Sequence, residues 1–395
     1  MRRLLEAFAI TAAAAFCVRS VGVSLRSSER IEPREPDREM PMISIIVPAR
    51  NEERQIEECV RSLLAQNYPR FEIIAVNDRS DDGTGAILAR VARENPRLTV
   101  VHGDALPAGW IGKPWALAQG ARIARGDWLL FTDADTTHEP LAASSAVQHA
   151  MRHGAHALSL LTTQRFETLA ERAALPSILW LIAFAVGSLD AINDPRRLEA
   201  AIFNGQYILF ERAAYDALGG HGAVRDRIAE DYEFARLVKR DGRFRGRLAG
   251  ASDLVYTRMY RSLREIWDGF SKNLYVAAHE NPRQAFAGLM MLAALSPLPE
   301  ALFASAVLKR ERMSAIRMAT VIAGTSCAAE FAMRRSRFPA GSGAFFPIGA
   351  AAMLAIFVNS ARQHRTGQVR WRGRAYEGRA ARAPKPLDPY GRGEL

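Results

Sequence analysis

The chain has 395 residues, with 53 Lys or Arg against 42 Asp or Glu, which gives a formal charge of +11 and a pI of about 10.0. This length accommodates one large catalytic domain and a second part. The basic clusters flank apolar segments instead of lining one patch with interleaved aromatic residues, which favours an anionic membrane surface over nucleic acid as the partner. The cysteines are too widely spaced for a disulfide framework or a metal site: Cys17, Cys59 and Cys327.

The first 25 residues begin with two arginines and continue as a short apolar run. Such a segment is either a cleaved signal peptide or an uncleaved membrane anchor, and the run is short for a full span. Five arginines follow between Arg19 and Arg38. The positive-inside rule therefore places the next domain in the cytoplasm. Residues 26–41 are polar and contain three prolines, which is typical of a linker.

From residue 42 onward, short apolar segments alternate with segments whose apolar residues recur at helical spacing. Strands are predicted at 43–47, 71–76, 98–101 and 128–132, and helices at 56–64, 86–91 and 114–124. This alternation predicts an α/β fold with a doubly wound, mostly parallel sheet. In such sheets ligands bind beyond the carboxyl ends of the strands, so the polar residues at those ends form the candidate site.

Two carboxylates one residue apart, Asp133 and Asp135, follow the fourth predicted strand. Side chains alternate along an extended chain, so these two point the same way and repel each other. A divalent cation such as Mg²⁺ or Mn²⁺ removes the repulsion, because it prefers oxygen ligands and often binds one or two carboxylates together with substrate phosphates. Taken alone, the pair is equally compatible with a solvated turn.

Polar residues also follow the three earlier strands: Asn51 and Glu52, then Asp78, then Asp104. Any one of them suits a turn or a helix cap. Carboxylates at four successive strand ends instead suggest a nucleotide diphosphate bound together with a metal. The glycine-rich signatures of dinucleotide-binding folds and of P-loops do not follow these strands, which disfavours both classes.

Three motifs now carry a family resemblance: Ile-Val-Pro-Ala-Arg-Asn-Glu-Glu at 46–53, Val-Asn-Asp-Arg-Ser-Asp-Asp-Gly-Thr at 76–84, and Asp-Ala-Asp at 133–135. As a set they resemble the family 2 glycosyltransferases of the GT-A fold, over about residues 42 to 280. Further segments at 106–116, 258–272 and 371–376 resemble the hopene-associated and the carotenoid (diaponeurosporenoate) glycosyltransferases, which act on lipids at membranes.

The resemblance implies a nucleotide-diphosphate sugar as donor and a divalent metal, Mg²⁺ or Mn²⁺, as cofactor. Glu52 and Asp78 lie where the family binds the nucleoside, and Lys113 lies where a basic residue approaches the nucleotide or its diphosphate. Asp135 would bind the metal, while Asp133 would contact the metal or the ribose. These roles suit the groups, since carboxylates accept hydrogen bonds from hydroxyl and imide groups and a cation neutralises phosphate.

The acceptor side is expected in the second half of the domain. In the family, the second carboxylate of the Glu-Asp pair that opens a helix near residue 230 is the catalytic base, which makes Asp231 the predicted base and His221 the alternative. Asn204, Arg258 and Arg261 are candidates for contacts to the diphosphate or the acceptor. The Gln-x-x-Arg-Trp pattern of processive and ceramide enzymes does not occur there, which leaves the arginines' roles open and weakens a polymerising function.

The C-terminal part contains several apolar segments interrupted by proline or charge, at 175–192, 285–308, 315–333 and 343–358. The sequence thus predicts an N-terminal membrane anchor (1–25), a linker (26–41), a GT-A domain (42–280), a membrane-associated helical region (281–361) and a basic cytoplasmic tail (362–395). Because nucleotide sugars are made in the cytoplasm, as the resemblance implies, an exported domain would lack its donor. Residues 1–25 are therefore expected to stay attached, with the enzyme anchored in or passing several times through the inner membrane.

The leading hypothesis is an inverting, metal-dependent glycosyltransferase that moves a sugar to a membrane lipid of hopanoid or carotenoid type. A polyprenyl phosphate or a growing glycan is the alternative acceptor, and a phosphate acceptor would need no strong base. A membrane-bound scaffold with an inactive transferase domain is the non-enzymatic alternative, against which the complete set of carboxylates argues.

Overall fold

The computed structural model describes residues 1–26, 29–279, 282–366, 369–371 and 374–376. These residues form two compact units, each assembled from separate stretches of chain. The sheet unit comprises Gly22–Glu167 and Val186–Met259. The helical unit comprises Met1–Val21, Thr168–Ala185 and the chain from Tyr260 onward.

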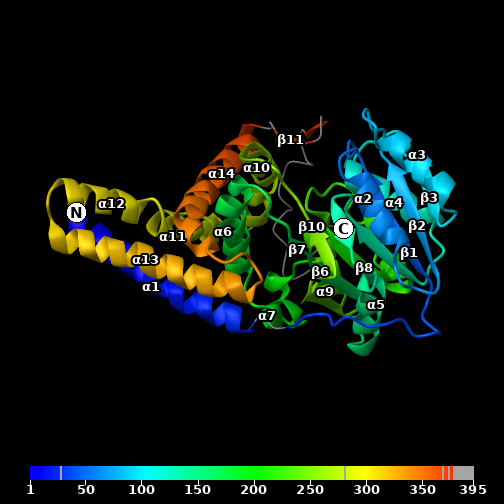
Figure 1. Ribbon diagram of the computed structural model, residues 1–395, viewed down its shortest axis with the longest axis horizontal. Coiled ribbons are helices and arrows are strands. Elements are labelled where there is room, and N and C mark those ends of the chain that lie inside the picture. The colour runs from blue at the N-terminus through cyan, green and yellow to red at the C-terminus, as the bar shows by residue number, and fades with distance from the viewer. Residues whose placement is uncertain (27–28, 280–281, 367–368, 372–373, 377–395) are drawn as a thin grey trace, which may run out of the picture. The chain divides into compact units, whose positions relative to one another are not determined.

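A seven-stranded sheet forms the centre of the sheet unit (Figure 1). Its strands, in spatial order, are β3 (Leu98–His102), β2 (Phe71–Asn77), β1 (Ile43–Ala49), β4 (Trp128–Thr132), β8 (Tyr207–Glu211), β6 (Ala157–Leu161) and β9 (Gly246–Gly250). Neighbours from β3 to β4 pair in parallel, and β6 pairs in parallel with β9. Only β8 among these strands runs antiparallel to its neighbours. The predicted doubly wound, mostly parallel sheet is confirmed, with β8 as the exception.

Successive side chains of each strand point to opposite faces of this sheet, and both sets are apolar. Helices therefore cover both faces. Ile45 and Ala75 belong to the core under α2 (Ile56–Leu64), α3 (Thr84–Glu94) and α5 (Ala142–Arg152). Ile46 and Val76 belong to the opposite core under α4 (Gly112–Ile123), α8 (Arg212–Ala217) and α9 (Glu230–Asp241). Burying one isoleucine contributes roughly 1.5–3 kcal/mol. A one-residue register shift, which would exchange the two faces, is therefore strongly disfavoured.

A second, three-stranded sheet shapes the chain after β4. It consists of β5 (Thr136–His138), β10 (Val255–Thr257) and β7 (Thr163–Gln164), with β10 in the middle. Thr136 pairs with Thr257 across the antiparallel β5–β10 ladder. The turn that carries Asp133 and Asp135 is thus fixed between a strand of the large sheet and a strand of the small one.

The predicted linker is an ordered part of the sheet unit. Ile31 is fully buried, and its backbone N–H bonds the carbonyl of Gly250 at 3.0 Å. Further along, Ser145 Oγ accepts from the backbone N–H of Arg34 at 2.9 Å, and Ser144 Oγ donates to its carbonyl at 2.6 Å. We call residues 29–41 the strap, since they run along α5 instead of hanging free between domains.

The boundary of the sheet unit also differs from the predicted domain at 42–280. The unit includes the strap but lacks residues 168–185 and the chain from Tyr260 onward, which pack with other apolar helices. The predicted apolar segment 175–192 is divided at Gly187, whose φ of 111° ends one helix. The shorter elements of the sheet unit are α7 (Leu189–Asn193), η1 (Leu198–Ala200) and η2 (Gly220–Gly222).

The helical unit is built from long helices (Figure 1). They are α1 (Arg2–Arg26), α6 (Leu169–Val186), α10 (Leu263–His279), α11 (Pro282–Leu295), α12 (Leu298–Leu308), α13 (Arg312–Arg335) and α14 (Phe346–Thr366), with η3 (Ser342–Phe345) before α14. The predicted interruption at Pro297 separates α11 from α12. A short hairpin of β11 (Val369–Trp371) and β12 (Arg374–Tyr376) lies in the segment predicted as a basic tail, and α14 extends four residues past the tail's expected start at 362. The rest of that tail lies outside the described residues.

A cluster of charged residues around the buried carboxylate of Glu6 joins α1 to α13. The carboxylate of Glu6 lies 2.7 Å from the guanidinium of Arg317 and 3.3 Å from that of Arg2. Ser314 Oγ donates to the same carboxylate at 2.5 Å. Around it, Ala9 and Ala13 of α1 pack against Met318 and Val321 of α13 and Leu302 of α12. Because removing one partner of a buried ion pair is costly, this cluster fixes the register of α1 against α13.

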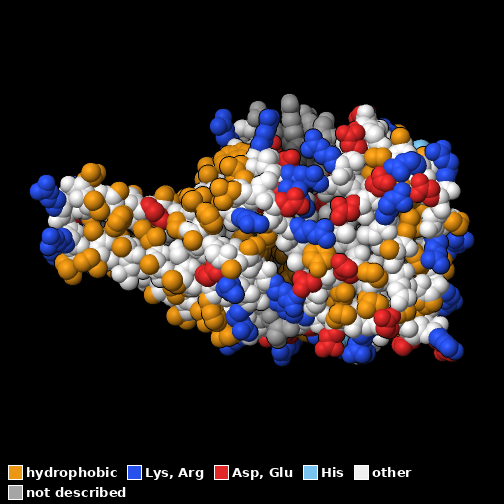
Figure 2. All heavy atoms as spheres, in the orientation of Figure 1, with side chains coloured by type: hydrophobic (Ala, Val, Ile, Leu, Met, Phe, Trp, Pro, Cys, Tyr) orange, Lys and Arg blue, Asp and Glu red, His pale blue; other side chains and the backbone are white. Residues whose placement is uncertain are grey.

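Four helical segments among the described residues are long and apolar enough to cross a membrane: Arg2–Arg26, Leu169–Val186, Ala285–Leu308 and Ser342–Gln363. In Figure 2 hydrophobic side chains gather over the surface of α11, α12 and α13, whereas charged side chains of both signs cover the sheet unit. Leu308, Met313 and Ile316 are 84%, 65% and 58% exposed. Exposed apolar side chains gathered in this way are typical of a surface that contacts lipid or another protein.

Candidate active site

The turn between β4 and β5, at the carboxyl end of a central strand of the large sheet, carries Asp133 and Asp135. Asp133 follows the last residue of β4, and its carboxylate is about one quarter exposed. The backbone carbonyl of Asp135 accepts a hydrogen bond from Thr257 Oγ1 at 3.3 Å. The backbone of the turn is therefore bound to β10. The carboxylates of the turn supply hard oxygen donors of the kind that Mg²⁺ and Mn²⁺ prefer.

Lys113, in the first turn of α4, joins this turn to the second half of the unit. Its Nζ lies 2.7 Å from Asp133 Oδ1 and 2.8 Å from Glu230 Oε1, and it donates to the carbonyl of Gly205 at 3.4 Å. Burial opposes the charge on this amine, but the surrounding carboxylates outweigh burial and raise its pKa well above the ordinary value. The site thus contains a permanent cation between two acidic groups.

Asp231, the predicted base, lies in the first turn of α9. Its Oδ2 accepts from the backbone N–H of Gly205 at 2.9 Å, and its Oδ1 accepts from that of Tyr232 at 2.8 Å. Burial and the adjacent charge of Glu230 raise the pKa of Asp231 to about 6, although Lys113 opposes them. A carboxylate with this pKa is ionised at neutral pH and accepts a proton more readily than an ordinary aspartate.

The first two strand ends form an interlocked pair of loops. Arg50 donates to the carbonyls of Asp78 and Arg79 at 2.7 and 3.1 Å. The backbone N–H of Asp78 bonds the carbonyl of Ala49 at 2.8 Å. The N–H of Glu52 bonds Thr84 Oγ1 at 2.8 Å. The two predicted nucleoside-binding residues are thus carried by adjacent parallel strands. Asp104, by contrast, follows the outermost strand β3, and its exposed carboxylate lies 3.8 Å from Arg122.

Asn204 serves as a structural residue of the loop before β8. Its side-chain amide donates to the carbonyl of Leu160 at 2.8 Å, and its backbone N–H bonds Ser159 Oγ at 2.7 Å. These contacts to β6 fix the position of the next residue, Gly205. The predicted contact of Asn204 with diphosphate or acceptor stays a prediction.

The two candidate arginines belong to different units. Arg258 directly follows Thr257, which pairs with Thr136, so continuing the ladder by one residue brings Arg258 opposite Asp135. Its guanidinium lies 2.6 Å from the exposed carboxylate of Glu167. Arg261 lies in the helical unit, where its backbone N–H bonds Glu265 at the start of α10. Of the two, only Arg258 shares the sheet unit with the aspartates.

His221 is a packing residue in this structure. Its ring lies against Phe131 and Phe234, with centroids 4.7 and 4.9 Å apart. Its Nδ1 is 2.8 Å from the hydroxyl of Tyr215. Burial, assisted by the charge of Lys113, lowers the pKa of His221 to about 3. A buried imidazole that weakly basic does not suit a general base at neutral pH, which leaves Asp231 as the base candidate.

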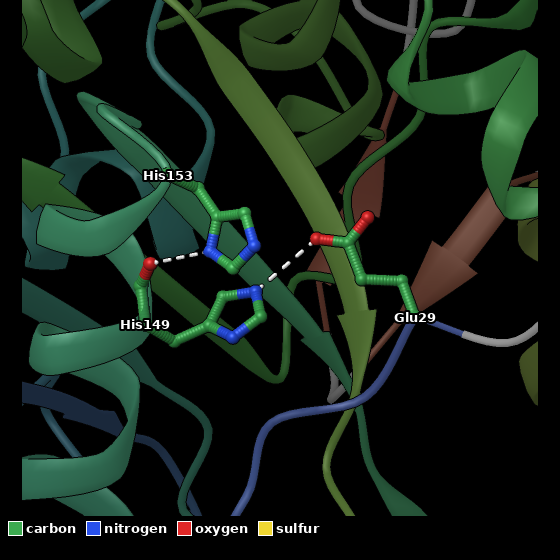
Figure 3. Close-up of side chains that lie close together, drawn as sticks. All are labelled: Glu29, His149 and His153. Carbon is green, nitrogen blue, oxygen red and sulfur yellow. Dashed lines mark hydrogen bonds and ion pairs between the residues drawn. The ribbon is translucent and has the colours of Figure 1, made fainter.

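Glu29, His149 and His153 form a second cluster of groups able to bind a metal (Figure 3). His149 lies on α5, His153 directly follows the last residue of this helix, and Glu29 belongs to the strap. Both oxygens of Glu29 are occupied, since Arg247 donates to them at 2.8 and 2.6 Å and Asn193 donates at 2.8 Å. His149 Nε2 lies 3.1 Å from the same carboxylate. A metal here would bind beside the Arg247 guanidinium, so we assign the cluster to fastening the strap.

Comparisons with known proteins agree with this geometry. Residues 44–219 match the family model described as glycosyl transferase family 2. The 4,4'-diaponeurosporenoate glycosyltransferases of Staphylococcus aureus strains bovine RF122 / ET3-1 and MRSA252 are each 26% identical, over 339 and 342 residues. Each alignment covers 85% of this chain and 88% of the relative.

A solved structure shares the fold. The mannosyltransferase PcManGT from Pyrobaculum calidifontis, in complex with GDP-Man and Mn²⁺, has a TM-score of 0.54 and 19% sequence identity, and the match covers 91% of this chain and 98% of that one. The matched family domain contains both the Asp133 turn and Lys113. The chain therefore contains a domain that matches the family 2 glycosyltransferases over residues 44–219, within a GT-A fold.

Proposed function

We propose that this enzyme is an inverting, metal-dependent glycosyltransferase that moves a sugar from a nucleotide-diphosphate sugar to a hydroxyl group of a membrane lipid. The observation that carries the proposal is the double ion pair of Lys113, at 2.7 Å from Asp133 and 2.8 Å from Glu230. It brings the acidic turn of the donor side next to Asp231, a carboxylate with a raised pKa. Donor activation and proton removal are thereby available in one place.

The residues present suit a divalent metal. Asp135 is the proposed ligand, and Asp133, which already accepts from Lys113, binds either the metal or the donor ribose. The PcManGT structure is a complex with GDP-Man and Mn²⁺, which supports the same class of ion here. A bound Mg²⁺ or Mn²⁺ would neutralise the charge that develops on the departing diphosphate.

The remaining roles belong to the chain's own side chains. Glu52 and Asp78 accept hydrogen bonds from the nucleoside, and Lys113 supplies a fixed positive charge to the diphosphate. Asp231 takes the proton of the acceptor hydroxyl as its oxygen attacks the anomeric carbon. Such general-base assistance typically contributes about 10²- to 10⁴-fold in rate. Preorganised positive charge at the leaving group contributes at least as much.

The proposed acceptor is a lipid of hopanoid or carotenoid type. Four segments long and apolar enough to cross a membrane and the exposed apolar residues of α12 and α13 support a membrane location. The name of the curated relatives, diaponeurosporenoate glycosyltransferase, supports a carotenoid-like acceptor. We place the enzyme in the inner membrane with the sheet unit in the cytoplasm, where nucleotide sugars are available.

Comparative lipid analysis tests this function most directly. Lipid extracts of cells with and without the protein are compared by mass spectrometry, and the purified full-length protein is assayed with a panel of nucleotide sugars and Mn²⁺ or Mg²⁺. The expected result is a glycosylated apolar lipid that depends on the protein, on the metal and on Asp135. A glycosylated polyprenyl phosphate would identify the alternative acceptor. A protein with neither nucleotide-sugar hydrolysis nor transfer in any combination would refute the enzymatic function.

A further inference from the structure

A buried polar group lies directly beneath the Asp133 turn. His138, on β5, is 4% exposed, and its Nε2 is 2.9 Å from Thr136 Oγ1 and 3.2 Å from Thr132 Oγ1. The two hydroxyl oxygens are 3.0 Å apart. Thr132 ends β4 and Thr136 begins β5, so the imidazole closes the base of the turn that carries Asp133 and Asp135.

Counting protons fixes the direction of these hydrogen bonds. Thr136 Oγ1 donates to the carbonyl of Asp133 at 2.7 Å, and Thr132 Oγ1 donates to the carbonyl of Gln206 at 2.8 Å. Each hydroxyl has a single proton, and a carbonyl can only accept. The two contacts between His138 and the hydroxyl oxygens then require a proton on Nε2. This one N–H is shared between Thr132 Oγ1 and Thr136 Oγ1. Burial lowers the pKa of His138 to about 3, so the ring is neutral and its Nε2–H is the proton shared with the two hydroxyl oxygens.

These hydrogen bonds connect the two halves of the site. On one side Thr136 holds the backbone of Asp133. On the other side Thr132 holds the carbonyl of Gln206, which adjoins Gly205, the residue whose N–H binds Asp231. The distance between the acidic turn and the loop that holds the base is therefore set by a neutral, buried bridge. Lys113 connects the same two segments through its charge.

We propose that His138 is a positioning residue for glycosyl transfer: its Nε2–H, shared between Thr132 and Thr136, keeps the metal-binding turn in register with the loop that holds Asp231. The inference rests on the proposed function, because it takes Asp135 as the metal ligand and Asp231 as the base. His138 itself touches neither substrate nor metal. Its effect passes through backbone carbonyls, as with the outer hydrogen-bond partners that orient metal ligands.

The first experiment measures metal affinity without turnover. Mn²⁺ is titrated into the full-length protein in detergent and free Mn²⁺ is followed by electron paramagnetic resonance, with no donor present. His138→Leu removes the proton donor and should weaken Mn²⁺ binding about 10- to 100-fold, the range found for outer partners of metal ligands. His138→Gln places an amide N–H near the position of Nε2 and should restore most of the affinity.

His221→Leu is the matched control. His221 is likewise buried and neutral, but it contacts Tyr215, Phe131 and Phe234 instead of the turn. This variant should lose thermal stability and keep its Mn²⁺ affinity. Equal Mn²⁺ affinity in wild type and His138→Leu would overturn the role of His138. A wild-type protein that binds no Mn²⁺ would instead refute the proposed metal site, and the role of His138 with it.

A second measurement determines the tautomer of His138 in the wild-type protein, so it does not depend on the folding of a variant. In protein labelled with ¹⁵N-histidine, the ring shifts of His138 should show the Nε2–H tautomer, unchanged between pH 8 and pH 5. The signal is assigned by its loss in His138→Gln or, if that protein does not fold, by its coupling to the Thr136 region. An Nδ1–H tautomer, or protonation within this range, would overturn the proton count and the proposal.

Discussion

Gly205 donates its backbone N–H to Oδ2 of Asp231 at 2.9 Å, and its carbonyl accepts from Lys113. The backbone of one residue therefore contacts both the predicted base and the predicted diphosphate-binding cation. The fit is close, because a Cβ at this position would come within 3.0 Å of Asp231 Oδ2 and 3.2 Å of Lys113 Nζ. Glycine here allows the loop to approach both charged groups at once.

Replacing Asp231 by Asn should abolish transfer while nucleotide binding persists. The amide oxygen of Asn still accepts from the N–H of Gly205, so the loop keeps its position, while the bond from the N–H of Tyr232 is lost and the group no longer accepts a proton. We expect a loss in kcat of at least 10²-fold with an unchanged Kd for the nucleotide, measured by calorimetry. Glu233→Gln, on the same first turn of α9, is the control and should keep full activity. Full activity of Asp231→Asn would exclude a base role and favour a phosphate acceptor.

The pH dependence follows from the raised pKa of Asp231. The base must be ionised, so kcat/KM should rise with pH through about 6 and level off above it. Glu230→Gln removes the neighbouring negative charge that helps to raise this pKa, so the acid limb should move to lower pH. A pH–rate profile of both proteins with a neutral lipid acceptor measures the shift. An acid limb near pH 4 in wild type, or movement to higher pH in the variant, would contradict the assignment.

Arg258 and Arg261 should differ sharply in their effect on catalysis. Arg258 comes one residue after the Thr257–Thr136 pair that ends the β10–β5 ladder. Arg261 lies just before α10 in the helical unit, where its backbone N–H donates to the carboxylate of Glu265. Arg258→Ala should lower kcat about 10²-fold, as expected for the loss of a charge that stabilises a leaving group. Arg261→Ala should change kcat less than threefold. Comparable losses in the two variants would show that both arginines act on the diphosphate.

The stability that Glu29 contributes by binding the strap to the sheet unit should decrease as the pH falls. Burial opposes ionisation of Glu29, but hydrogen bonds from His149 and Arg247 prevail and lower its pKa from 4.5 to about 2. A depressed folded-state pKa contributes stability above the unfolded value, and this contribution is lost as pH falls from about 4.5 to about 2. The shift corresponds to stabilisation on the order of 3 kcal/mol.

Thermal unfolding of Glu29→Gln tests this contribution. The variant should unfold at a lower temperature than wild type at pH 7, and the difference should shrink steadily below pH 4.5. Glu32→Gln is the control, since that carboxylate is 76% exposed in its pair with Arg34 and should contribute little. A Glu29→Gln difference that grows on acidification would contradict the sign.

Local periodicity was enough to predict the sheet. The segments around Ile45 and Ile73 are apolar on both faces, which only a strand covered by helices on each side allows. The motifs around Asp78 and Asp133 were recognisable because each directly follows such a strand. Asp104 also follows a strand, but its strand is the outermost one, and sequence does not reveal the spatial order of strands.

Contacts between distant segments escaped prediction. Thr136 and His138 alternate along β5, so they face the same side. Thr132, which contacts both, donates to the carbonyl of Gln206, and Gln206 is 68 residues further along the chain from His138. The proline and charge content of the strap is typical of a linker, although Ser144 and Ser145 bind its backbone. The sequence singles out Glu230 only as the neighbour of Asp231, because the ion pair of Glu230 with Lys113 depends on the tertiary fold.

The assembly of the sheet unit from two stretches of chain has a practical consequence for preparing the enzyme. A fragment starting at residue 42 would lack the strap. The core residues that pack around Ile31 would then be exposed to water. A fragment ending at Met259 would still carry α6, an apolar helix of the other unit, because residues 168–185 interrupt the sheet unit. No single pair of cuts excises a water-soluble catalytic fragment. A soluble version requires replacing residues 168–185 by a short polar connection while keeping residues 29–41.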